Sequence, residues 1–239
     1  MKAIILAAGR GSRMGDLTDF SPKCLSEIHG RALLDIQIEA LTKAGIDEIG
    51  IVTGYKRELL SNRNLVEFVN TRWESTNMLT SLSCANQWLN SDICIVSYSD
   101  IFYDHLAIES LMSTNSDLAV SYDPNWLSLW TRRFGDPLLD AETFRLNKEG
   151  RLLEIGRHPK SADEIEGQYM GLIRLSPRGW SEIERLRLLL EPSERDAKHM
   201  TGILQEVIEA NRVLVDAIPY MGNWGEVDTP EDLSLYTSN

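Results

Sequence analysis

A run of glycines and cations near the start of the chain has the residue types and spacing of a phosphate-binding loop. Residues 6–15 read LAAGRGSRMG, and residues 21–23 read SPK. Small residues let backbone N–H groups approach phosphate oxygens closely, and Arg10, Arg13 and Lys23 add positive charge. A lysine held by a proline a few residues beyond such a loop is suited to a leaving pyrophosphate. For the glycines alone, a tight turn with surface arginines remains the alternative.

Familiar nucleotide-binding patterns do not describe this loop. The dinucleotide fingerprint G-x-G-x-x-G would need a glycine at position 14, where Met14 stands. The P-loop pattern G-x-x-x-x-G-K-[ST] is also missing, because no lysine follows a glycine at that spacing. Nor does the chain contain the G-x-S-x-G elbow of α/β-hydrolases. None of these three patterns therefore accounts for the loop.

The elements that must position this loop alternate between strands and helices. Continuous apolar runs predict buried strands at 2–8, 48–54, 65–70, 92–100 and 117–123. Amphipathic spacing predicts helices at about 31–44, from a cap at Ser75 or Thr76 to about 89, and at about 104–113. We therefore expect an α/β fold with a Rossmann-like, mostly parallel central sheet flanked by helices. The loop leaves the carboxyl end of the first strand, where such sheets bind ligands.

The second half of the chain has a different pattern. It predicts a β-hairpin insertion at 141–156, a strand at 167–176, helices at 177–190 and 199–210, and a late strand at 213–220. The closing segment should form a helix that is capped by Thr229 and has Pro230 in its first turn. We found no linker or repeat, so we expect one domain over residues 1–239.

Composition narrows the function classes. The chain has 24 Lys and Arg against 36 Asp and Glu, a net charge of −12, which argues against general nucleic-acid binding. No apolar run approaches the ~18 residues of a membrane span, and the apolar part of the start is too short for a secretory signal. Three cysteines without a C-x-x-C motif favour free thiols in a reducing cytoplasm. Between a monomer and a homodimer, the sequence leaves the choice open.

The glycine loop also carries a family resemblance. LAAGRGSRM followed by SPKCL resembles the signature of the nucleotidyltransferase (nucleoside-diphosphate-sugar pyrophosphorylase) superfamily, L-A-A-G-x-G-[ST]-R-[ML] and then P-K. TNMLTSL at 76–82 is similar to the small-molecule cytidylyltransferase branch, which includes phosphocholine, aminoethylphosphonate and phosphoglutamine cytidylyltransferases. The stretches at 132–144, 164–172 and 222–233 resemble the bacterial capsule-modification members, including the phosphoglutamine type. The strand layout agrees with this resemblance over the whole chain.

The resemblance implies an enzyme that transfers CMP from CTP to a small phosphorylated or phosphonate acceptor and releases pyrophosphate. The product would be a CDP-linked precursor for a surface polysaccharide or lipid. Residues 1–123 would then be the nucleotide-binding half, and residues 124–239 the acceptor half with the hairpin and a metal-binding C-terminal segment. Alternatives are a sugar-1-phosphate nucleotidyltransferase using UTP or another NTP, a retaining-type glycosyltransferase, and a nucleotide-sensing module without turnover.

The resemblance also assigns roles to nucleotide-site residues by position. Catalysis would fall to Lys23 and Arg13, which would neutralise phosphate oxygens, and Asp100 and Asp228 would hold Mg²⁺, with Glu226 as a supporting carboxylate. Mg²⁺ prefers oxygen ligands, commonly one or two carboxylates, so aspartates from distant strand ends suit it. The nucleotide-binding set is Leu6, Ala7, Ala8, Gly9, Arg10, Gly11, Arg13, Lys23, Thr76, Asn77 and Ser81.

Acceptor recognition is predicted from polar residues of the hairpin and the strand that returns from it. The set is Asp140, Glu142, Glu166, Gln168 and Tyr169. Because alternate residues of a strand face one side, Asp140 and Glu142 can share a face, as can Glu166 and Gln168. Trp126, Trp130 and Phe134 either enclose a quaternary ammonium by cation–π attraction or form a packed lid. For Arg132 and Arg133 the alternatives are an acceptor-phosphate contact and a surface role.

Overall fold

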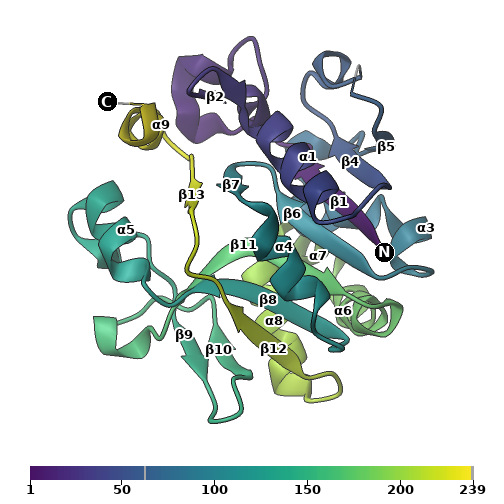
Figure 1. Ribbon diagram of the computed structural model, residues 1–239. Helices are drawn as coiled ribbons and strands as arrows, with labels where there is room; N and C mark the ends of the chain where they lie inside the picture. The colour runs from purple at the N-terminus through teal and green to yellow at the C-terminus, as the bar shows by residue number, and fades with distance from the viewer. Residues whose placement is uncertain (62, 238–239) are drawn as a thin grey trace.

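A central β-sheet organises the molecule (Figure 1), and the computed structural model describes residues 1–61 and 63–237. Its strands among these residues are β1 (Lys2–Ala7), β4 (Ile49–Thr53), β5 (Val66–Val69), β6 (Cys94–Tyr98), β8 (Leu118–Asp123), β11 (Gln168–Leu175) and β12 (Val215–Pro219). They pair in the order β12-β8-β11-β6-β1-β4-β5. Strand β11 runs antiparallel to both neighbours, and the other pairings are parallel. The predicted mostly parallel α/β sheet is confirmed.

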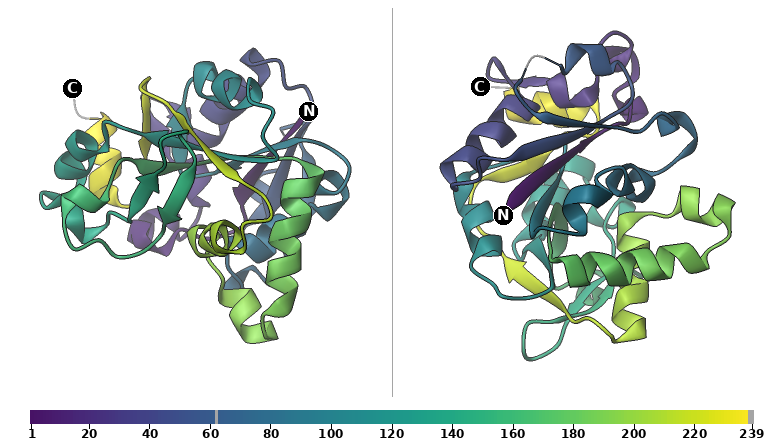
Figure 2. Two further views of the ribbon diagram at one scale, coloured as in Figure 1. Left: turned by 90° about the horizontal axis from the view of Figure 1, so that it is seen from below. Right: turned by 90° about the vertical axis from the view of Figure 1, so that its right-hand side faces the viewer.

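Helices cover both faces of this sheet (Figure 2). One face packs against α2 (Met78–Ser83), α3 (Asn86–Leu89), α6 (Pro177–Leu189) and α8 (Met200–Ala210). The other face packs against α1 (Leu33–Lys43), α4 (His105–Met112) and α5 (Trp126–Phe134). Helix α7 (Pro192–Ala197) follows α6, and α9 (Pro230–Thr237) packs near Met14 and Leu33. Within the described part of the chain, no helix is long and apolar enough to cross a membrane.

Strand β1 shows why its sequence is apolar throughout. Ile4 and Leu6 belong to the core on one face of the sheet, whereas Ile5 and Ala7 belong to the core on the other. A strand that is buried on both faces loses the alternation of polar and apolar residues. At its carboxyl end Leu6 pairs with Tyr98 of β6, so the glycine loop and the turn after β6 leave the same edge of the sheet.

Short antiparallel ladders surround the sheet. The predicted hairpin is present as β9 (Phe144–Leu146) and β10 (Leu152–Ile155). The pairs β2 (Glu27–Ile28) with β3 (Arg31–Ala32), and β7 (Ile101–Tyr103) with β13 (Trp224–Glu226), were not predicted. Strands of two or three residues are too short to show a periodic pattern. The β7–β13 ladder matters most, because it brings the end of the chain beside the carboxyl end of β6.

Several helix boundaries differ from the prediction. The cap of α2 is Asn77, whose side-chain oxygen accepts a hydrogen bond from the Met78 backbone at 2.7 Å. The hydroxyl of Thr76 instead donates to the Arg72 carbonyl at 3.0 Å. The predicted helix is also divided, with α2 ending at Ser83 and α3 beginning at Asn86. Thr229 caps α9 as predicted, because its hydroxyl accepts a hydrogen bond from the Asp232 backbone at 3.2 Å.

Strand β11 is irregular near its beginning, at the end of the sheet where the acidic residues Asp100 and Asp228 lie. The register of β11 against β8 shifts between Tyr169 and Ile173, and Gly171 lies there with a φ of 79°. A Cβ atom at Gly171 would lie 2.9 Å from a ring carbon of Tyr98. Both the backbone angle and the contact therefore require glycine.

We predict that Gly171→Ala destabilises the fold by about 2 kcal/mol or more, from backbone strain together with a clash. Gly150→Ala is the matched control, since Gly150 has a φ of 76° but a Cβ atom there would meet nothing within 4 Å. It should therefore show only the strain, about 1 kcal/mol. Urea unfolding of both variants checks this, and equal losses would contradict the packing argument.

Candidate active site

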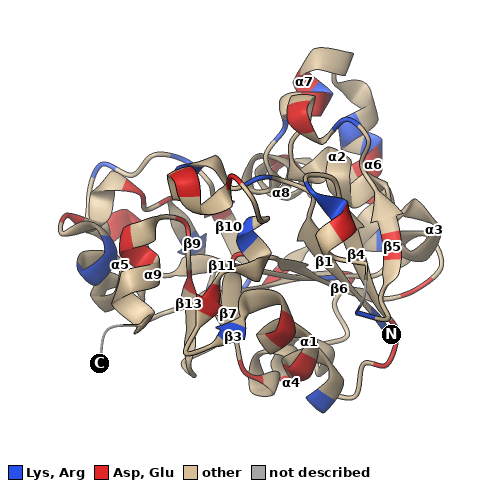
Figure 3. Ribbon diagram, turned by 90° about the horizontal axis from the view of Figure 1, so that it is seen from above, with Lys and Arg blue, Asp and Glu red and all other residues tan. Residues whose placement is uncertain are grey.

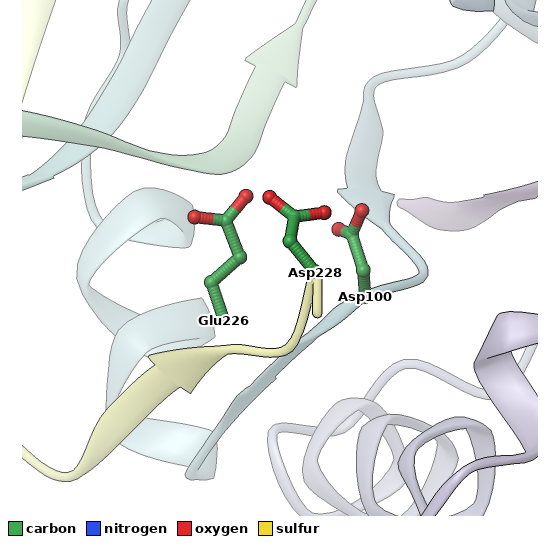
Figure 4. A group of neighbouring side chains, drawn as sticks. All are labelled: Asp100, Glu226 and Asp228. Atoms are coloured by element: carbon green, nitrogen blue, oxygen red, sulfur yellow. The ribbon is translucent and has the colours of Figure 1, made fainter. Parts of the chain in front are cut away.

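Carboxylates meet at the carboxyl edge of the sheet. Asp100 lies in the turn after β6, Glu226 ends β13, and Asp228 follows two residues later. The Val227 N–H donates to the Asp100 carbonyl at 2.8 Å, which fixes the two segments together. Each of the three acids offers one oxygen, and these oxygens lie within 4.8 Å of one another. Figure 4 shows the three side chains gathered at one place from two distant parts of the chain.

Lys23 occupies the centre of this acidic group. Its Nζ lies 2.6 Å from Oδ2 of Asp100 and 2.6 Å from Oδ1 of Asp228. Burial by itself favours the neutral amine, but these carboxylates outweigh it and raise the pKa of Lys23 above its ordinary value. Gly11 makes room for this side chain, since a Cβ there would lie 2.7 Å from the Lys23 Cβ. The phosphate-binding loop and the acidic group are therefore one structure.

Two arginines, one exposed and one buried, complete the network. A guanidinium nitrogen of Arg13 lies 3.0 Å from Oδ2 of Asp228, and the Arg13 side chain is 61% exposed. Arg133 of α5 is fully buried and lies 2.6 Å from Glu226, 2.9 Å from Asp232 and 3.6 Å from Asp228. The sequence did not indicate this role for Arg133. A usable signal was its position three residues after Trp130, on the same helix face.

The electrostatics of the cluster differ between its members. Burial favours the neutral form of Asp228, but Lys23 and Arg13 outweigh it and lower its pKa. Burial and the nearby Asp228 carboxylate raise the pKa of Glu226 to about 8, although Arg133 opposes the rise. The two neighbouring acids therefore differ in how readily they ionise.

This set of oxygens fits a hard divalent cation. The buried Oδ1 atom of Asp100 has no hydrogen-bond partner among the described residues. An unpartnered buried carboxylate oxygen is costly unless a cation or a donor reaches it. Lys23 already shows that a positive charge can be held equally by Asp100 and Asp228. Carboxylate oxygens without nitrogen or sulfur ligands suit Mg²⁺.

A cavity of about 210 Å³ adjoins the acidic group. Four of the predicted acceptor residues line it, namely Asp140, Glu142, Gln168 and Tyr169, together with Trp130, Trp224, His199, Arg13 and Glu226. The Thr201 hydroxyl donates to the Glu142 carboxylate at 3.2 Å. The Gln168 amide holds the Glu142 backbone through bonds of 2.7 and 3.2 Å, so its contribution is to support the cavity wall.

Among the described residues, neither Asp140 nor Glu142 forms an ion pair. Burial raises the pKa of both carboxyl groups, although Arg133 and Arg13 oppose the rise at Asp140, and the Thr201 hydroxyl opposes it at Glu142. A cation in the cavity would relieve this cost. Asp140 and Glu142 are therefore candidate partners for a positive group that enters the cavity.

Other predicted acceptor residues lie elsewhere. Glu166 is not among the cavity-lining residues, because its carboxylate accepts a hydrogen bond from the Leu146 backbone at 2.6 Å and fastens the hairpin. Trp126 is buried against Trp130 in the core on the α5 face, and Phe134 packs against the same core. These two aromatic residues favour the packed-lid alternative, whereas Trp130 also faces the cavity. Arg132 is exposed, in contrast to Arg133.

The predicted nucleotide-binding residues form two groups. Leu6, Ala7 and Ala8 are buried where β1 ends, and a Cβ at Gly9 would meet nothing within 4 Å. Arg10 forms an ion pair with Asp19 beyond the loop. The loop is therefore buried where it leaves β1 and has open space around Gly9.

The second group, Thr76, Asn77 and Ser81, forms hydrogen bonds with neighbouring protein side chains. The Asn70 amide donates to the hydroxyls of Thr76 and Ser81, each at 2.9 Å. The Asn77 amide nitrogen lies 3.1 Å from Nδ1 of His199, a cavity residue that the sequence did not single out. Base reading by this second group stays a prediction.

Comparison with known proteins shows the family of this chain. The profile of the MobA-like NTP transferase domain matches residues 3–159. The chain is 37% identical to the CTP:phosphoglutamine cytidylyltransferase of Campylobacter jejuni, over 98% of each protein. It is 30% identical to the choline-phosphate cytidylyltransferase of Streptococcus pneumoniae, over 64% of this chain and 67% of that protein.

Solved structures agree at the level of the fold. The inositol-1-phosphate CTP transferase from T. maritima superposes with a TM-score of 0.77 at 19% identity, covering 98% of this chain and 93% of that one. The family expected from the LAAGRGSRM and SPK motifs is therefore confirmed. The chain belongs to the MobA-like NTP transferase domain family.

Proposed function

We propose that this protein transfers CMP from CTP to a small acceptor that carries a phosphate or phosphonate group and a protonated amine. An acceptor oxygen attacks the α-phosphorus of CTP, the bond from that phosphorus to the bridging oxygen breaks, and pyrophosphate leaves. The CDP-linked product would serve the modification of a surface polysaccharide or lipid. The observation that carries the proposal is the meeting of the glycine loop, Lys23 and the acidic group beside a cavity with unpaired carboxylates.

Asp100 and Asp228, with Glu226 beside them, would hold Mg²⁺. When bound, the metal would neutralise charge on the triphosphate and orient it. Support comes from the grouped carboxylate oxygens and from the buried Asp100 oxygen that lacks a partner among the described residues.

Lys23 and Arg13 would supply the positive charge that phosphate transfer requires. Both bond the acidic group in the structure, so a cation that takes over Asp100 and Asp228 frees them for phosphate oxygens. Both reactants are anionic, and no covalent protein nucleophile is needed. Positioning and charge neutralisation can therefore provide most of the catalysis.

The amine of the acceptor would lie against Asp140 and Glu142, which have no cationic partner among the described residues. Arg13, which also lines the cavity, would contact the acceptor's phosphate. The relatives support an acceptor with a positively charged nitrogen, since the similar proteins are named for phosphoglutamine, which has an α-amino group, and for choline phosphate, which has a quaternary ammonium. Residues 1–123 would thus bind the nucleotide and residues 124–239 the acceptor, within one domain.

Pyrophosphate release tests the reaction itself. Four NTPs are each combined with phosphoglutamine, phosphocholine, 2-aminoethylphosphonate or glucose 1-phosphate. We expect release with CTP and an amine-bearing acceptor, loss of activity with EDTA, and recovery with Mg²⁺. Release only with UTP and glucose 1-phosphate would contradict the proposal, as would CTP binding without turnover with all these acceptors or sugar transfer without pyrophosphate.

Lys23→Met should lower kcat by about 10²–10³-fold, because it removes charge that stabilises the departing pyrophosphate. Lys43→Met is the matched control, since Lys43 is an exposed lysine at the end of α1. Steady-state kinetics at saturating CTP, with circular dichroism to verify folding, makes the comparison. A loss below threefold in folded Lys23→Met would remove Lys23 from the mechanism.

Asp140→Asn and Glu142→Gln should each raise the acceptor KM about tenfold or more, the worth of one charged hydrogen bond. The KM for CTP should stay within about twofold, because the proposed nucleotide contacts lie elsewhere. Asp163→Asn removes an exposed carboxylate of the same half and should change neither constant. Equal changes in both KM values would show that the two residues do not act on the acceptor.

A further inference from the structure

We propose that Arg133 is a positioning residue for the metal carboxylates, and that α5 holds Asp228 and Glu226 in place through its guanidinium group. The role of the metal rests on the proposed function. The positioning role of Arg133 rests on its contacts in the structure, and neither the sequence motifs nor the comparisons assign such a role to any residue.

Burial and contacts show that Arg133 is a structural centre of the acidic group. Its side chain is 0% exposed. Nη1 donates to Glu226 at 2.6 Å, and Nε and Nη2 donate to the two oxygens of Asp232 at 2.9 and 3.1 Å. Nη2 also lies 3.6 Å from Asp228. One buried cation thus contacts carboxylates on β13, on the loop after it and on α9.

Asp232 carries the effect of Arg133 to the backbone of Asp228. The oxygen of Asp232 that receives Nη2 also accepts the N–H groups of Asp228 at 2.9 Å and Thr229 at 3.2 Å. Asp232 is 2% exposed, so water cannot easily replace these bonds. A shift of the guanidinium would therefore move the backbone that presents the Asp228 carboxylate.

The geometry explains why this residue is arginine rather than lysine. A planar guanidinium has donors in fixed directions and can bond several carboxylates at once, whereas an ammonium is a point charge. The rings of Trp130 and Phe134 lie 5.2 and 4.8 Å from the guanidinium carbon, and they limit its orientation further. A lysine at this position would keep the positive charge but would lose the fixed arrangement of several N–H donors.

Charge balance separates Arg133 from the other cations of the site. In the proposed reaction Lys23 and Arg13 turn toward phosphate oxygens, while Arg133 is enclosed and stays with the acids. Arg133 therefore offsets the repulsion between the carboxylates of Glu226 and Asp228 throughout the proposed reaction. Figure 3 shows α5 and α9 side by side.

Arg133→Lys, Arg133→Met and the control Arg132→Met test the inference. Arg132 is the adjacent residue on α5, and it is exposed, so the same change removes a charge without entering the network. The readout is Mn²⁺ binding to the nucleotide-free protein by electron paramagnetic resonance, with thermal unfolding in parallel. We expect about 10–100-fold weaker binding in folded Arg133→Lys, as for other residues that orient metal ligands, and a larger loss in Arg133→Met. Arg132→Met should stay within about twofold of wild type.

Kinetics separates positioning from simple stabilisation. Arg133→Lys should raise the Mg²⁺ concentration for half-maximal rate and leave the CTP KM at saturating Mg²⁺ unchanged. A lower melting temperature with wild-type Mn²⁺ affinity and rate in Arg133→Lys would overturn the inference. If wild-type protein neither binds Mn²⁺ nor releases pyrophosphate, the proposed function fails instead.

Discussion

The ion pairs of Lys23 with Asp100 and Asp228 are the constraint on which the rest of the structure depends. These residues are separated by 77 and 205 positions, and their charged groups are largely removed from water. Removing one partner of such a buried pair costs about 3–5 kcal/mol, because the other charge is left uncompensated. The sheet edge, the glycine at position 11 and the β7–β13 ladder are all needed to keep these groups in contact.

Two kinds of carboxylate lie within a short distance of each other, and their surroundings differ. Asp228 is balanced by Lys23 and Arg13, and so its pKa is lowered. Asp140 and Glu142 lack such partners among the described residues, and burial raises their pKa. The first environment suits a site that exchanges one cation for another. In the proposed function, the first environment would hold the metal, and the second would receive the positively charged nitrogen of the acceptor.

The sequence predicted those parts of the site that depend on long elements or on a dense motif. Strand β1 and the loop after it follow from a continuous apolar run and from residue types, and Lys23 follows from the SPK segment. Asp100 and Asp228 were predicted from the family resemblance. The sequence did not predict the β7–β13 pairing, because three-residue strands have no measurable period. The roles of Glu166 and Arg133 were also not predicted, because each depends on tertiary contacts. Alternation along a strand could not tell that Glu166 would fasten the hairpin, and a charged residue in a short helix gave little reason to expect full burial.

The late position of Asp228 in the chain has a consequence for biosynthesis. Domains assemble largely as the chain leaves the ribosome, with amino-terminal parts first. The loop, Lys23 and Asp100 can therefore meet early, but the segment at 224–232 joins them only after the intervening second half of the sheet has been made. A nascent polypeptide that ends before Asp228 would lack one of the two carboxylates that neutralise Lys23, and its Lys23 would remain only partly compensated.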